Sequence, residues 1–121
     1  MLFRSEFIAE ALRKIPICAA SHDDRAVARL FPTPTGGSDE DADEDWREHV
    51  VPGLNELFQS HIDVVIKDLA EMREEDGTLM LAFSTAHTHS WMHTLNQARL
   101  ALGALHDITE NDMEEIGRAH V

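Results

Sequence analysis

The chain has 121 residues, of which 23 are acidic and 10 are Lys or Arg, giving a formal net charge of -13. This length suits one domain with one hydrophobic core, and the negative charge opposes direct binding to nucleic-acid phosphates or anionic membranes. Cys18 is the one cysteine, so no intramolecular disulfide can form, and no apolar run approaches the roughly 18 residues of a membrane span. We therefore expect a single cytoplasmic domain over residues 1–121.

Apolar spacing near the N-terminus predicts a first helix. Phe3, Phe7, Ala11 and Ile15 recur at steps of four, which places them on one helical face toward the core. Pro16 lacks a backbone N–H and crowds the preceding turn, so it marks the end of this helix or a kink in it.

A short helix and an acidic loop should follow. Asp23 or Asp24 suits the N-cap of about two helical turns, which stop before Pro32 because a residue that precedes proline avoids helical backbone. At about residues 33–44, a Gly-Gly pair and an acidic run predict a mobile, solvated loop whose last carboxylates suit a helix N-terminus. Calcium chelation is the alternative, although the run lacks the spacing of an EF-hand loop.

The longest predicted helix covers about residues 45–73. Pro52-Gly53 interrupts its apolar pattern, so we expect either a kink or two helices that meet with Pro52 in a first turn. The following "TLMLAF", within residues 78–83, alternates with the period of a strand. It is too short to stand alone, so we expect it to pair with residues 1–4 in a small ribbon.

A second long helix is predicted over about residues 86–105, antiparallel to the first, and Thr109 suits the N-cap of a further helix. One continuous face of the second long helix should supply core side chains: Trp91, Leu95, Ala98, Leu102 and Leu105. Together these elements predict a mainly α fold, a small bundle of four or five helices with a minor two-stranded β-ribbon.

Three histidines accompany the start of that helix, in "AHTHSWMHTL". One interpretation is a helix N-terminus with solvated histidines and no cofactor; a pH-sensitive contact is another. The alternative is a site for zinc or another divalent metal, because His89 and His93 are four residues apart and share a face. His87 points elsewhere on a helix, so the third ligand would be His61 or a glutamate.

No catalytic constellation is visible in the sequence. Ser84, Ser90 and Cys18 have no local motif that would activate a nucleophile, and the Gly-Gly pair lacks the context of a phosphate-binding loop. We therefore expect a protein that is not an enzyme.

A polar line lies beside the predicted core face of the second long helix. Asn96, Arg99 and Gly103 follow one another at steps of three and four. Arg99 could hold a carboxylate of the first long helix bidentately, while Gly103 would let another backbone approach closely. We expect this line, with Trp91, to act as a structural clamp, and the alternative is a docking surface for a partner.

The segment "WMHTLNQARLALG", with the upstream "DDRAVARLFP" and "DGTLML", resembles the bacterial family catalogued as domain of unknown function two-thousand-seventeen, which includes AosR-like oxidative-stress regulators. The resemblance covers about residues 23–108. The residues that carry it in order and spacing are Trp91, Leu95, Asn96, Arg99, Leu100, Ala101, Leu102 and Gly103.

The resemblance implies a largely helical, cytoplasmic protein, whose relatives often have genes near that of the ClpS protease adaptor. Some members look like the AosR regulator, in which a cysteine pair senses oxidation and a sigma factor is the partner. This chain has Cys18 alone, so that disulfide switch does not carry over, and His89 and His93 are not part of the family pattern. Members tend to continue with another apolar helix, so we expect a shorter or trimmed member here, and dimerisation is one way to cover the apolar surface left exposed.

These observations favour a non-enzymatic regulatory or adaptor-like module that binds another protein through a surface built around Asn96 and Arg99. The partner is not identified by the sequence, and neither nucleic acid nor a membrane is expected. The alternative function is divalent-metal binding by His89 and His93 with His61.

Overall fold

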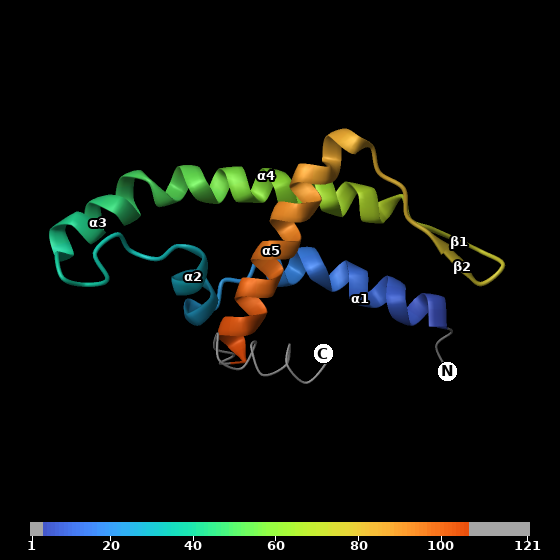
Figure 1. The fold of residues 1–121 in the computed structure, drawn as a ribbon, viewed down its shortest axis with the longest axis horizontal. Coiled ribbons are helices and arrows are strands. Elements are labelled where there is room, and N and C mark those ends of the chain that lie inside the picture. The colour runs from blue at the N-terminus through green and yellow to red at the C-terminus, as the bar shows by residue number, and fades with distance from the viewer. Residues whose placement is uncertain (1–3, 107–121) are drawn as a thin grey trace, which may run out of the picture.

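The computed structural model describes residues 4–106, which form five α-helices, a short 3-10 helix and one two-stranded sheet (Figure 1). The mainly α fold class is confirmed. Residues 1–3 and the helix expected from Thr109 lie outside the described residues. In chain order the elements are α1 Arg4–Ala19, α2 Asp24–Leu30, α3 Glu40–His49, α4 Val51–Ala70, β1 Arg73–Glu75, β2 Thr78–Met80, η1 Thr85–His87 and α5 Thr88–Leu105.

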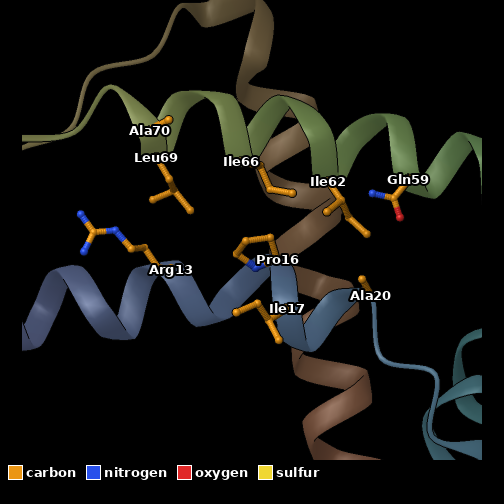
Figure 2. Close-up of a pocket in the computed structure, with 9 residues that line it drawn as sticks. All are labelled: Arg13, Pro16, Ile17, Ala20, Gln59, Ile62, Ile66, Leu69 and Ala70. Atoms are coloured by element: carbon orange, nitrogen blue, oxygen red, sulfur yellow. The ribbon is translucent and has the colours of Figure 1, made fainter.

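Helix α5 lies across the other helices and packs against α1, α2 and α4. Both views show it crossing α1 and α4 steeply (Figures 1 and 2), so the antiparallel pairing expected for the two long helices is wrong. Small side chains allow this close crossing, because α5 buries Ala98, Ala101 and Ala104 while α1 buries Ala19 and α2 buries Ala26. Helices whose contact residues are small approach each other more closely than helices with large ones.

The core therefore differs from the predicted apolar face of α5. Trp91 and Ala98 are buried as expected, but Leu95 and Leu102 are 42% and 39% exposed. Two clusters form the core, one around Ala19, Ile62 and Ala98 and the other around Val65, Leu69 and Trp91. The small-residue face of α5 packs inward because three helices have to fit against it.

Helix α1 also turns a different face inward than its large apolar residues predict. Pro16 lies inside the helix, which continues to Ala19, and the buried positions are Ala9, Pro16 and Ala19. Phe7 is 65% exposed and Ala11 is exposed as well, so the predicted stripe is wrong at both positions. Phe3 lies outside the described residues.

Pro52 separates two helices. Helix α3 ends at His49, and α4 begins at Val51 with Pro52 in its first turn. This is the second of the two expected arrangements, and it suits proline, because the first-turn N–H groups of a helix have no partner within the helix. The Val50 N–H still donates to the Trp46 carbonyl, 2.9 Å away, at the end of α3.

The predicted ribbon exists with a different partner strand. β2 pairs antiparallel with β1, with Arg73 opposite Met80, whereas Arg4 of the expected N-terminal partner begins α1 and residues 1–3 lie outside the described part of the chain. The connection is Asp76-Gly77, and both residues have positive φ, 53° and 79°. Two such residues form the type I′ turn that suits a two-residue hairpin, so the local Asp-Gly turn determines the pairing.

The acidic segment expected as a mobile loop at about residues 33–44 contains local hydrogen bonds and the start of a helix. Its second part begins α3, with the Asp39 carboxylate accepting from the Ala42 N–H. Asp43 is 1% exposed, and its carboxylate accepts from the Thr35 N–H and hydroxyl and from the Gly37 N–H. Burial would raise the pKa of Asp43, but these hydrogen bonds and the charge of Arg47 outweigh burial and lower that pKa.

The small-residue crossing leads to a first prediction. Ala101→Leu should destabilise the fold by about 1–3 kcal/mol in urea unfolding, because overpacking a close helix contact forces the helices apart, and Ala101 is 0% exposed. Ala11→Leu on the exposed side of α1 is the matched control, with an expected change within about 0.5 kcal/mol. If Ala101→Leu destabilises the fold no more than the small change expected for Ala11→Leu, the crossing tolerates large side chains and the prediction is wrong.

Candidate functional site

The four residues predicted as a clamp or interaction line fall on two faces of α5. Trp91 is buried in the core, whereas Asn96 and Arg99 are exposed and Gly103 is half-buried. Trp91 therefore belongs to the core, whereas Asn96, Arg99 and Gly103 lie toward the outer surface of α5.

A buried carboxylate holds Trp91. The Trp91 Nε1–H donates to Asp68 Oδ2 at 2.9 Å, and His87 Nδ1 lies 2.9 Å from the same oxygen. Asp68 is 4% exposed and comes from α4, while His87 ends η1. Burial would raise the pKa of Asp68, but the hydrogen bonds from Trp91 and His87, with the charges of His87 and Lys67, outweigh burial and lower it. Asp68 therefore joins α4 to the start of α5.

Arg99 does not form the predicted bond to an acid of the first long helix. Its Nη2 donates to Asn96 Oδ1 at 2.8 Å, one turn earlier in the same helix and on the exposed surface. The contact joins two residues of the same helix. The predicted ion pair between Arg99 and an acid of the first long helix is therefore absent among the described residues. Asn96 and Arg99 remain together as a polar pair on the outer face of α5.

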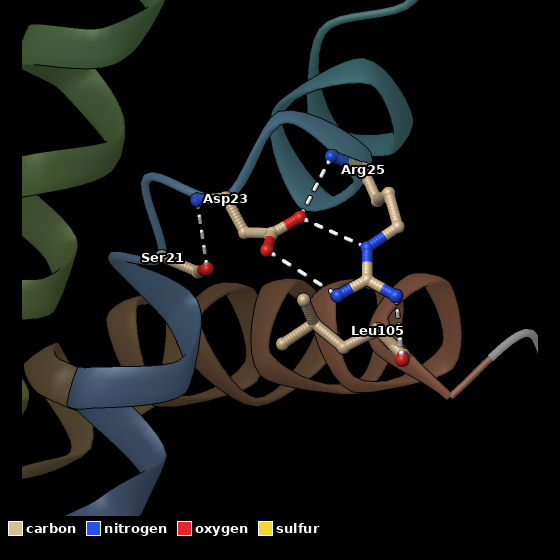
Figure 3. Close-up of polar contacts among 4 residues, drawn as sticks. All are labelled: Ser21, Asp23, Arg25 and Leu105. Carbon is tan, nitrogen blue, oxygen red and sulfur yellow. Dashed lines mark hydrogen bonds and ion pairs between the residues drawn. The ribbon is translucent and has the colours of Figure 1, made fainter.

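A guanidinium clamp is present at Arg25 instead (Figure 3). Arg25 Nη1 donates to the Leu105 carbonyl at 3.3 Å, and its backbone N–H and Nε donate to Asp23 Oδ1 at 2.9 and 3.1 Å. The side-chain and backbone hydrogen bonds from Arg25 lower the pKa of Asp23. A cation at the last carbonyls of a helix is favourable, so Arg25 ties the N-terminus of α2 to the C-terminus of α5.

The structure brings together the three histidines of the metal hypothesis. The His61 ring from α4 lies 4.6 Å from the His93 ring and 5.1 Å from the His89 ring, centroid to centroid, and His89 and His93 are 6.3 Å apart. His61 Nδ1 lies 2.8 Å from the Ser90 hydroxyl. His87 belongs to the Asp68 contact and not to this cluster.

His93 has an enclosed ring nitrogen. Its Nδ1 is buried and has no hydrogen-bond partner among the described residues, and Phe58 packs against the ring at 4.8 Å. Burial, together with the charges of His61 and His89, lowers the pKa of His93. The potential ligand atoms of the three histidines do not all lie within 4.8 Å of one another; over residues 4–106, the group that meets this spacing is the exposed Asp45, Glu48 and His49.

An apolar groove lies between α1 and α4, and the sequence patterns did not predict it. Ile62, Ile66 and Leu69 point from α4 toward Pro16 of α1, and α5 passes behind them (Figure 2). The groove has a volume of about 520 Å³, with Arg13 and Gln59 at its rim. A second cavity of about 440 Å³, between α4 and α2, shares Ala20, Gln59 and Ile62 with it. The two cavities therefore lie next to each other along α4, and together we call them the α4 trough.

These features define a small helical domain with a buried carboxylate clamp, a histidine cluster and an open apolar trough. The chain belongs to the family described as domain of unknown function DUF2017, whose family model matches residues 8–120. No curated protein and no solved structure matches the chain significantly. Within the described residues, no helix is both long and apolar enough to cross a membrane.

The Asp68 contacts lead to a second prediction. Asp68→Ala should destabilise the fold by about 1–3 kcal/mol at pH 7, because two donors lose a buried acceptor. The folded-state pKa of Asp68 is lowered from 3.8, so its contribution is complete above that value and is lost as the pH falls through the folded-state pKa. Urea unfolding of wild type and variant should therefore give a difference that shrinks below about pH 4.

Asp63→Ala is the matched control for this prediction, because Asp63 is an exposed carboxylate of the same helix. Its stability difference from wild type should stay small at every pH. An Asp68→Ala difference that stays constant from pH 7 to pH 3 would contradict the assigned role of the carboxylate.

Proposed function

We propose that this protein is a non-enzymatic, adaptor-like regulatory module of the cytoplasm that binds an amphipathic helix of another protein in the α4 trough. The observation that supports the proposal is the pair of neighbouring cavities along α4, which share Ala20, Gln59 and Ile62 as wall residues. A helix that lays an apolar face into a hydrophobic groove is a recurrent mode of peptide recognition.

The exposed side chains of the trough suit such a contact. Ile17 and Ile66 line it and are 70% and 48% exposed, while Ile62 and Leu69 form its buried floor. Exposed, clustered apolar side chains gain free energy when a partner covers them. A buried floor with an exposed apolar rim is the arrangement that a docked helix would complete.

Charge favours a basic partner over a second copy of this chain. The protein has a formal net charge of -13, so two copies repel each other, whereas a partner with Lys and Arg beside its apolar face is attracted. Arg13 at one end of the trough offers one site for an acidic group of the partner. We therefore propose a helix that is apolar on one face and predominantly basic around it.

The regulatory part of the proposal rests on the family resemblance. An oxidation switch of the AosR type needs two cysteines, and this chain has Cys18 alone, half-buried beside the Ala19, Ile62 and Ala98 cluster. Regulation here would therefore act through partner binding and not through an intramolecular disulfide.

A third prediction tests the trough. The double variant Ile17→Ser with Ile66→Ser should lose the partner that wild type captures from the cells that produce this protein, with at least about tenfold weaker binding of the purified partner. The expected loss follows from removal of two apolar contacts. Raising the salt concentration should weaken wild-type binding, because the attraction is partly electrostatic.

Met92→Ser is the matched control, since Met92 is an apolar side chain of α5 with 65% exposure that does not line the trough. It should retain the partner. Arg99→Ala tests the surface predicted from sequence: loss of the partner by this variant and not by the double variant would move the interface to the outer face of α5. A wild-type dimer that the double variant abolishes would identify a second copy as the occupant and refute the partner helix.

A further inference from the structure

The α4–α5 crossing gathers three imidazoles beside the buried Ser90, on a face of α4 that neighbours the trough. We infer that His61, His89 and His93 form a binding site for one divalent transition-metal ion of the zinc class. None of these three histidines lines the α4 trough, so this proposal rests on other residues than partner binding does, and failure of either leaves the other standing.

The spacing of the rings supports a shared ion. With metal–nitrogen bonds of about 2.1 Å and tetrahedral angles, the ring centroids of two imidazoles on one zinc ion lie about 5 Å apart. The three observed centroid distances are 4.6, 5.1 and 6.3 Å. The distances from His61 to His89 and to His93 match this value, whereas His89 and His93 lie farther apart, so the exposed His89 ring has to move closer for all three to share one ion.

The remaining adjustment is a change of ring orientation together with a shift of the exposed His89 side chain toward His93. The ligand-capable atoms of the three histidines do not all lie within 4.8 Å of one another. Rotation about the Cβ–Cγ bond moves the ring nitrogens but leaves the centroid in place, and this terminal torsion is broad. His89 is exposed and without a hydrogen-bond partner among the described residues, so its ring is free to turn.

Two nitrogens are suited to act as ligands. When His61 donates its Nδ1–H to the Ser90 hydroxyl, its Nε2 keeps a free lone pair, and metal-bound histidines usually donate their other N–H in this way. His93 Nδ1 is buried without a hydrogen-bond partner among the described residues. A bound ion would give this atom the partner that buried nitrogens normally have.

The composition of the site determines which metal it prefers. Imidazoles suit zinc, nickel and copper, whereas calcium and magnesium prefer carboxylate and carbonyl oxygens. Three nitrogen ligands leave a fourth tetrahedral position for water. Because His61 belongs to α4 and the other two residues to α5, the ion would join the two helices and stabilise their crossing.

Titration of tag-free, chelator-treated protein with Zn²⁺ and Co²⁺ tests the site. Calorimetry of wild type should give one ion per chain, Zn²⁺ should raise Tm, and Co²⁺ should give the intense visible absorption of tetrahedral cobalt. His89→Ala, which removes an exposed ring, should weaken zinc binding by more than about tenfold, since losing even an outer partner of a ligand costs that much.

His49→Ala is the matched control, because it removes the histidine of the exposed Asp45, Glu48 and His49 group. It should bind zinc as wild type does, and circular dichroism should show that both variants fold. Equal zinc affinity in wild type and His89→Ala, loss of binding in His49→Ala, or no stoichiometric binding by wild type would each overturn the proposal.

Discussion

The Asp68 carboxylate is 4% exposed, and a buried charge left without partners costs on the order of 3–5 kcal/mol. Its partners, Trp91 and His87, both belong to the segment that starts α5. The position of this segment on α4 is therefore set by a polar requirement and not by apolar burial alone. His61 precedes Asp68 by two helical turns and so lies on the same face of α4. The register that pairs Asp68 with Trp91 also brings His61 beside Ser90 and His93.

The far part of α5 contributes little apolar area to the core. Its buried face consists of alanines and of polar residues such as Thr94 and Gln97, whose side-chain oxygens have no hydrogen-bond partner among the described residues. Alanine buries less apolar area than leucine, and an unpaired buried polar atom is unfavourable. The crossing thus depends strongly on its anchors, which are Asp68 at one end of α5 and Arg25 at the other.

The sequence supports the prediction of element types better than of packing faces. Pro52 predicts an interruption between residues 45 and 73, because the cost of proline within a helix is local, and the division into α3 and α4 is the second of the two arrangements expected there. Leu95 and Leu102 were wrongly assigned to the core, because hydrophobic periodicity ranks leucine above alanine and takes no account of how closely neighbouring helices approach. The pairing of β2 with β1 was not predicted, although Asp76-Gly77 is a strong local signal for a turn between two adjacent strands.

The candidate sites divide in the same way. Spacing on one helix placed His89 and His93 together, and His61 could be proposed as their third member only as one of several residues. The position of Asp68 within the apolar run of α4 weakly indicates a buried carboxylate. Its partners, His87 and Trp91, cannot be read from the sequence, because they reach Asp68 only where α5 crosses α4. The α4 trough left no signal in the sequence, because it exists only where α1 and α4 stand apart over α5.

This distribution of side chains bears on function. The chain keeps alanines where its helices cross and leaves Ile17 and Phe7 largely, and Ile66 about half, exposed to water. A domain stabilised only by its own core would gain from the reverse arrangement, since large apolar side chains release more free energy on burial. The observed arrangement makes sense when the outward apolar groups have something else to bury them. Two of these three side chains, Ile17 and Ile66, line the trough above its buried floor. Under the proposed function, a bound partner would supply the burial that the small-residue core gives up.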